Sequence, residues 1–244
     1  MNERLQGQIA LVTGASAGIG RACALALAAE GAEIIATART QAALQDVVRN
    51  IENSGGKARY VAGDLNDNAF LDRLGREAGA VDILVNNAGI LTYAPFIDTS
   101  LDDIELMVRT NLLAPLRLTH WIAGAMAKRG CGHVIMISSG AARRPVPLGL
   151  VYTATKHAIA GMTRVLRMEL QDSGLKVTEI APGSVETGIR DTSTHPQYVA
   201  KMQGRSYQLL APEDVASAVV YAATLPEHCT THLIEVKPRF GPSS

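Results

Sequence analysis

The chain has few of the features that mark secreted, membrane-spanning or nucleic-acid-binding proteins. Its 244 residues include three cysteines, Cys23, Cys131 and Cys229, which lie far apart. This spacing argues against a disulfide framework or a zinc site, and we expect buried, reduced thiols in a cytoplasmic protein and no bound metal. The 23 basic and 23 acidic residues balance, so neither nucleic acid nor an anionic membrane is an expected partner.

Long apolar runs are also missing. No stretch approaches the roughly 20 apolar residues that span a bilayer, and Met1–Gly7 lacks the apolar segment of a secretion signal. Apolar residues nevertheless make up 47% of the chain, enough for a substantial core. A chain of this length suits a single α/β domain, residues 1–244, with one wide sheet.

Short apolar runs alternate with longer amphipathic segments along the chain. We expect strands at Ile9–Thr13, Glu33–Thr37, Ala58–Ala62, Asp82–Asn86, His133–Ser138, Lys176–Ile180 and His232–Val236. We expect helices at Ile19–Glu30, Gln41–Asn53, Leu101–Lys128, Val151–Gln171 and Pro212–Thr224. This alternation predicts a doubly wound parallel sheet of the Rossmann type, with strand order 3-2-1-4-5-6-7 and helices on both faces.

Two segments depart from regular patterns. The helix expected at Leu101–Lys128 contains Pro115, which should kink it or remove a backbone hydrogen bond near Asn111. The segment Glu186–Leu210 lacks a strong periodicity and contains Pro196. We therefore expect a mobile flap over the substrate there, rather than an element of the core.

A glycine-rich turn joins the first strand to the first helix. Its sequence runs from Thr13 to Gly20 with glycines at 14, 18 and 20, and with Ser16 and Ile19 between them. Glycines allow a tight turn and bring backbone N–H groups close to a pyrophosphate, and the helix dipole adds to the attraction. The turn predicts a dinucleotide site, with a purely structural turn as the alternative.

Several further motifs occur in order along the chain. They are Asp64-Leu65 after the third strand, Asn86-Asn87-Ala88-Gly89 after the fourth, Asn111, Ser139, the run from Tyr152 to Lys156, and Pro182-Gly183. From about Gly7 to Gly188 their order and spacing resemble the short-chain dehydrogenase/reductase family. The resemblance implies an NADP- or NAD-dependent oxidoreductase.

The resemblance also implies which residues contact the cofactor. Asp64, followed by Leu65, is expected at the adenine, Asn87 near the ribose, and Val185 and Thr187 around the nicotinamide amide. Asp64 could instead cap a helix, and Asn86 and Asn87 could serve only turn chemistry.

The end of the second strand distinguishes NADP from NAD. An acidic residue there would bind the ribose diol of NAD and repel a 2′-phosphate, but Ala38 occupies this position and Arg39 follows it. A guanidinium can pair with a phosphate through two hydrogen bonds. We therefore predict NADP(H). Ala17 stands inside the glycine turn where many NADP-preferring members carry a basic residue.

Tyr152 and Lys156 are four residues apart on one expected helix, so their side chains share a face. A tyrosine has a reference pKa of about 10, and a nearby ammonium favours its ionised form. Tyr152 can then exchange a proton with a substrate oxygen as general acid or base.

The remaining catalytic candidates follow from the family spacing. Ser139, rather than its neighbour Ser138, is expected to hydrogen-bond the substrate oxygen. Lys156 would also hold the nicotinamide ribose, and Asn111 would hold a water next to the lysine. Alternatively, Asn111 could satisfy carbonyls freed by Pro115.

The substrate is left open by these motifs. A ketone or 3-oxo acid derivative, a 3-oxoacyl thioester and a small 3-hydroxy acid such as serine all remain as candidate substrates. A further alternative is a protein that binds the cofactor without turnover, but the intact Ser139, Tyr152 and Lys156 argue against it. Arg143 and Arg144, expected as exposed loop residues, could meet a carboxylate. By the resemblance, the two longest helices pair across two-fold axes in a homodimer or homotetramer.

Overall fold

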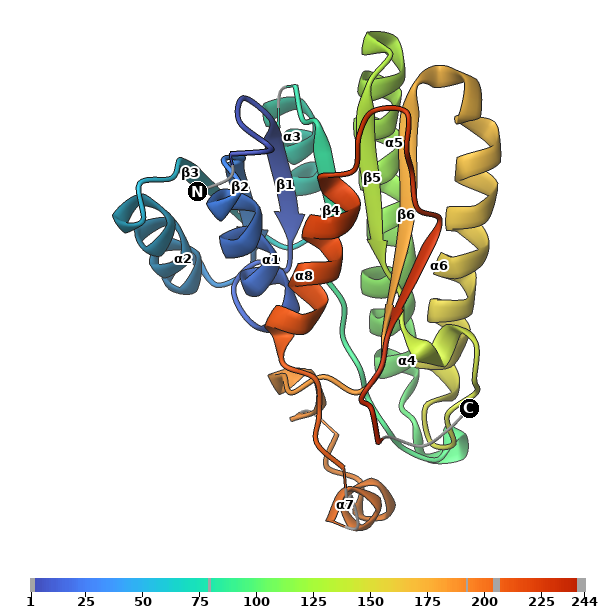
Figure 1. Ribbon diagram of the computed structural model, residues 1–244. Coiled ribbons are helices and arrows are strands. Elements are labelled where there is room, and N and C mark those ends of the chain that lie inside the picture. The colour runs from blue at the N-terminus through green and yellow to red at the C-terminus, as the bar shows by residue number, and fades with distance from the viewer. Residues whose placement is uncertain (1–2, 79, 192, 204–206, 241–244) are drawn as a thin grey trace.

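The computed structural model describes residues 3–78, 80–191, 193–203 and 207–240. A central sheet with helices on both faces dominates Figure 1. Its strands are β1 (Ile9–Thr13), β2 (Glu33–Ala38), β3 (Ala58–Ala62), β4 (Ile83–Asn86), β5 (Gly132–Ile137), β6 (Leu175–Pro182) and β7 (Leu233–Val236). All neighbours pair in parallel, in the order β3-β2-β1-β4-β5-β6-β7. The expected doubly wound Rossmann-type fold is confirmed.

Successive strand residues point to opposite faces of the sheet and build two cores. Ala10 and Val12 pack under α1 (Gly18–Ala29), α2 (Gln41–Asn53) and α8 (Pro212–Ala223). Leu11 packs on the other face, under α3 (Asn68–Glu77), α5 (Ala114–Arg129) and α6 (Leu150–Glu169). Both faces of the strands are therefore apolar, as in parallel sheets covered by crossover helices.

The helix expected at Leu101–Lys128 is divided. It comprises α4 (Leu101–Val108), a π-helical turn at Arg109–Leu113 and α5. Pro115 is the second residue of α5 and has no N–H to donate to the carbonyl four residues before it. The wider turn follows from this missing donor, and it holds Asn111 at 1% exposure. A kink was expected here, but not a π-helical turn.

The segment Glu186–Leu210 has more regular structure than expected. It contains a 3-10 turn at Gly188–Arg190 and the helix α7 (Pro196–Gln203). In Figure 1, α7 lies beyond the carboxyl ends of the strands. Thr192 and residues 204–206 of the expected flap lie outside the described residues. Its mobility remains a prediction.

Some expected surface properties need correction. Cys23 is buried, and burial raises the pKa of its thiol to about 12, but Cys131 is exposed and Cys229 is half-buried. The expectation of three buried thiols is therefore wrong.

None of the described helices is both long and apolar enough to cross a membrane.

Apolar side chains are exposed on α5 and α6, and this fits the expected pairing of these helices between subunits. They are Leu116, Trp121, Leu150, Val165 and Met168. The homodimer or homotetramer itself remains a prediction.

The start of α1 lies so close to Gly14 and Asn87 that only glycine fits at position 20. A Cβ built on Gly20 would lie 2.2 Å from the Gly14 carbonyl oxygen and 2.4 Å from Asn87 Nδ2. By contrast, a Cβ on Gly124, in the interior of α5, meets nothing within 4 Å.

These two glycines provide a matched stability test. Gly20→Ala should lower the free energy of unfolding by about 1–3 kcal/mol through overpacking. Gly124→Ala should raise it by up to about 1 kcal/mol, because alanine is the better helix former. Urea denaturation of both variants measures the difference, and equal effects would contradict the close approach of α1 to Gly14 and Asn87.

Candidate active site

Two adjoining cavities open along the carboxyl edge of the sheet, where ligand sites of open α/β folds lie. One, of about 380 Å³, lies over the glycine turn and extends to the ends of β2 and β3. The other, of about 780 Å³, contains Ser139, Tyr152 and Lys156. Their linings share Ile19, Asn87, Gly89, Thr187 and Ile189. We call them the nucleotide cavity and the substrate cavity.

The glycine turn has the geometry that an anion site requires. Gly14 and Gly18 have φ angles of +64° and +52°, a region that favours glycine. Ala17 precedes the helix and supplies no side-chain cap to its first N–H groups. These donors and the positive end of the helix dipole remain available to a phosphate. Ser16 and Ile19 line the same cavity.

Asn87 stabilises the glycine turn through hydrogen bonds to its backbone. Its Nδ2 donates to the Thr13 carbonyl at 2.8 Å and lies 3.4 Å from the Gly14 carbonyl, while its backbone N–H donates to Thr13 Oγ1. Its amide thus holds the backbone of the turn, which was the alternative to a ribose contact, although Asn87 also lines both cavities.

Thr187 approaches the turn from the other side, because a Cβ on Gly18 would lie 3.0 Å from its Cγ2. Val185 is buried and pairs with Leu210 in an isolated β-bridge. Both residues line the substrate cavity.

The far end of the nucleotide cavity contains Asp64, Leu65 and Asn66. Asp64 accepts from the backbone N–H of Asn66 at 2.9 Å, whereas the side-chain cap of α3 is Asp67. The helix-cap interpretation of Asp64 is therefore wrong. Asn66 donates to Thr110 Oγ1 at 2.9 Å, but its buried Oδ1 has no partner within the described part of the chain. Such an atom calls for a bound donor.

Arg39 lies at the rim of the nucleotide cavity, directly after β2. Its side chain is exposed, and no carboxylate of the described residues forms an ion pair with it. The guanidinium is thus accessible at the position that distinguishes NADP from NAD.

Tyr152 and Lys156 lie one turn apart on α6 and are both buried. Lys156 Nζ lies 5.7 Å from the centre of the Tyr152 ring and donates to the Ile137 carbonyl at 3.0 Å. Burial lowers the pKa of Lys156 to about 8, although the charge of Glu179 acts to raise it.

The pKa of Tyr152 differs from the expectation of a value lowered by Lys156. Burial raises this pKa above its ordinary value, and this effect exceeds the lowering by a Ser139 hydrogen bond and by the charge of Arg190. The phenol is thus protonated at neutral pH and is a proton donor in this state.

The two neighbouring serines have different surroundings. Ser138 is buried and donates to Glu179 Oε1 at 2.5 Å. Ser139 caps a 3-10 turn at Gly140–Ala142, where its Oγ accepts from the Ala141 N–H at 3.1 Å. Its hydroxyl also hydrogen-bonds Tyr152, and both side chains line the substrate cavity. The geometry thus favours Ser139 over Ser138.

Asn111 does not serve the carbonyls freed by Pro115 with its side chain. Its Nδ2 donates to the Ile90 carbonyl at 2.9 Å, and its Oδ1 accepts from the Ile90 N–H at 2.8 Å. A Cβ on Gly89 would lie 3.2 Å from Asn111 Oδ1 and 3.8 Å from Lys156 Nζ. Asn111 is therefore brought close to Lys156, and both flank Gly89.

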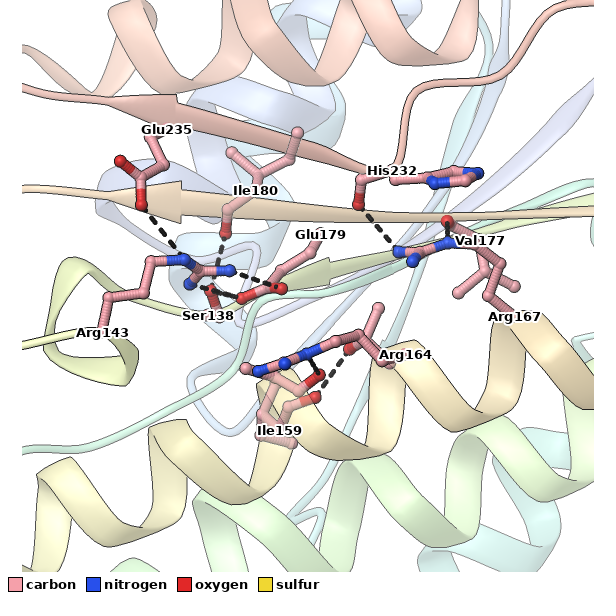
Figure 2. A network of polar contacts seen from close by, with 12 residues as sticks. Ser138, Arg143, Ile159, Arg164, Arg167, Val177, Glu179, Ile180, His232 and Glu235 are labelled. Atoms are coloured by element: carbon pink, nitrogen blue, oxygen red, sulfur yellow. Dashed lines mark hydrogen bonds and ion pairs between the residues drawn. The ribbon is translucent and has the colours of Figure 1, made fainter.

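A buried carboxylate ties the Ser139 loop to the sheet. Figure 2 shows the carboxylate of Glu179, on β6, facing both Ser138 and Arg143. Arg143 donates to both Glu179 oxygens at 2.9 and 2.8 Å, and its Nε lies 3.1 Å from Glu235. Burial acts to raise the pKa of Glu179, but the hydrogen bonds from Arg143 and Ser138 outweigh it and the net pKa is lowered.

Arg143 therefore differs from the expected exposed loop residue. Its charge is matched by two carboxylates, so it has no free charge for a substrate carboxylate. Sequence reasoning also missed Asn66, Glu179 and Arg190. Glu179 could have been found as the lone acid inside an otherwise uncharged strand segment, Val177–Pro182.

Comparisons with known proteins agree with this geometry. The short chain dehydrogenase family matches residues 8–197. A glycine betaine reductase of Emericella nidulans is 37% identical over 98% of this chain, which spans 19% of that protein's length. A ketoacyl reductase of Nostoc is 35% identical over 89% of this chain and 76% of that protein.

Solved structures show the same relationship. The closed form of a serine dehydrogenase complexed with NADP⁺ is 32% identical and has a TM-score of 0.86, and the match covers 94% of each chain. Because the family match extends over most of the chain and includes both cavities' principal motifs, the protein is a member of the short-chain dehydrogenase family.

Proposed function

We propose that this protein is an NADP(H)-dependent oxidoreductase that interconverts a ketone, including 3-oxo acid derivatives, and a secondary alcohol. The observation that carries the proposal is the continuity of the two cavities, with Ser139, Tyr152 and Lys156 in the substrate cavity next to the shared lining. A nucleotide in one cavity can reach a substrate in the other.

The residues of the nucleotide cavity fit NADP. The uncapped N–H groups at the start of α1 receive the pyrophosphate. Arg39 pairs with the 2′-phosphate, while Asp64, Leu65 and the unpartnered Asn66 Oδ1 meet the adenine. Asn87, Val185 and Thr187 lie at the end of the cofactor site that faces the substrate.

In reduction, bound NADPH supplies the hydride to the carbonyl carbon. Tyr152 donates its phenolic proton to the carbonyl oxygen, and the Ser139 hydroxyl donates a hydrogen bond to the same oxygen. The ammonium of Lys156 favours the phenolate that remains and holds the nicotinamide ribose. Asn111 holds a water beside Lys156, through which Tyr152 regains its proton. Oxidation follows the reverse course.

A second candidate is oxidation of a small 3-hydroxy acid such as serine. It is favoured by residues 225–228 and 233–238, whose sequence is similar to that of such members, and by the serine dehydrogenase neighbour. Reduction of a 3-oxoacyl thioester is favoured by the ketoacyl reductase relative and by a 27% identical 3-oxoacyl (acyl-carrier-protein) reductase structure from Agrobacterium tumefaciens.

Tyr152→Phe tests the mechanism. The variant should lose about 100- to 10,000-fold in kcat, because the proton donor is absent, while NADPH binding is retained. The decrease in NADPH absorbance measures turnover on a panel of ketones, 3-oxo esters and 3-oxoacyl thioesters, with serine and NADP⁺ for the reverse reaction. Tyr221→Phe on the exposed side of α8 is the control, and near-normal turnover by Tyr152→Phe would refute the mechanism.

Arg39→Asp tests the cofactor assignment. It replaces a phosphate partner by a carboxylate suited to the ribose diol of NAD. The ratio of kcat/KM with NADPH to that with NADH should fall at least about tenfold and invert, given the strength of charge-assisted hydrogen bonds. Arg49→Asp, on the helix α2 that follows Arg39, controls for the change of net charge. A ratio that stayed constant would show that Arg39 does not meet the 2′-phosphate.

A further inference from the structure

The substrate cavity is lined by more basic than acidic side chains. The basic residues are Arg143, Arg144, Lys156, Arg190, Lys237 and Arg239, and the acidic one is Glu235. An excess of one charge in a cavity attracts ligands of the opposite charge. The cations differ, however, in whether the protein already supplies their partners.

Three of these cations are engaged within the protein. Arg143 is paired with the carboxylates of Glu179 and Glu235. Lys237 Nζ lies 2.5 Å from Glu235 Oε2. Lys156 is bound to a backbone carbonyl and acts on Tyr152. None of them is free to bind a substrate anion without losing an existing contact.

Arg190 is different. It is half-buried, and its Nη1 donates to the Val185 carbonyl at 2.8 Å. Across the described ranges, no carboxylate lies within the 4.0 Å of an ion pair from it. One of the five N–H donors of a guanidinium is thus used. A partly desolvated charge without a counterion is unfavourable and is relieved by a bound anion.

The position of Arg190 indicates which ligand this anion belongs to. Arg190 lines the substrate cavity but not the nucleotide cavity, whereas its neighbours Thr187 and Ile189 line both. Its charge also acts on the phenol of Tyr152, so the guanidinium lies near the reacting oxygen. An anion at Arg190 therefore belongs to the substrate and not to the phosphates of the cofactor.

We propose that Arg190 binds a carboxylate of the substrate and makes the enzyme selective for oxo acids and hydroxy acids over their neutral analogues. This inference rests on the proposed oxidoreductase function. A carboxylate accepts two parallel hydrogen bonds from one guanidinium, which fixes the orientation of the substrate while its carbonyl oxygen meets Ser139 and Tyr152.

The test compares oxo acids with their methyl esters in NADPH oxidation. Acetoacetate and longer 3-oxo acids, each paired with its ester, have the same carbonyl but differ in charge. The wild type should show a kcat/KM for the acid about 10- to 100-fold above that for the ester, a range set by charge-assisted hydrogen bonds. Arg190→Met should abolish this preference by raising KM for the acid, so that acid and ester are used about equally, with NADPH affinity retained.

Two further variants distinguish a specific contact between Arg190 and the substrate carboxylate from the general electrostatic attraction of a basic cavity. Arg239→Met removes another cation from the cavity wall and should keep the preference for the acid. Arg190→Lys keeps the charge without the paired donors and should retain part of it. Ester turnover by each variant shows that it is folded.

Several results would overturn the inference. They are equal use of acid and ester by the wild type, an unchanged ratio in Arg190→Met, an equal loss in Arg239→Met, or weakened NADPH binding in Arg190→Met. In each case ester reduction would leave the proposed function standing. Reduction of neither compound class would refute the proposed function as well.

Discussion

The buried carboxylate of Glu179 is the constraint on which the catalytic part of the molecule depends. It lies inside the sheet at 2% exposure, where an unpaired charge would be strongly unfavourable. Ser138 and Arg143 supply its hydrogen bonds, and these two residues flank Ser139 along the chain. Satisfying one buried charge therefore fixes the loop that carries the proposed oxyanion donor, and the same charge also acts on Lys156.

A division of roles follows from the sheet. Its carboxyl edge presents a glycine-rich turn on one side of β4 and a cavity with hydroxyl, phenol and cationic groups on the other. Burial keeps Tyr152 protonated and makes Lys156 easier to deprotonate. In the proposed reaction, an oxidised nicotinamide would supply positive charge to the site, and this would favour the ionised form of the Tyr152 phenol. Tyr152 is thus held as a proton donor, and the oxidation state of the cofactor would change the pKa of its phenol.

The fold could be predicted from the sequence because each feature that indicates it lies within a short stretch of the chain. Apolar strands alternate with amphipathic helices, and the glycine turn marks the first crossover, so the strand order was predictable. Helical spacing predicted that Tyr152 and Lys156 share a face, and the family resemblance implied their catalytic roles. The contacts of Arg143 were not predictable, because Glu179 lies 36 positions away and only the pairing of β5 with β6 brings it to the Ser139 loop. Likewise, α7 was missed because the helix is only eight residues long and begins at Pro196.

The most direct test of the account is the fate of hydrogen in a single turnover. With NADPH dideuterated at C4 and a carbonyl substrate in ordinary water, the alcohol should carry one deuterium on its carbinol carbon, as read by mass spectrometry and NMR. The proton on its oxygen should come from solvent by way of Tyr152. An alcohol formed without deuterium on that carbon, or NADPH bound with no transfer to any carbonyl tested, would contradict the account.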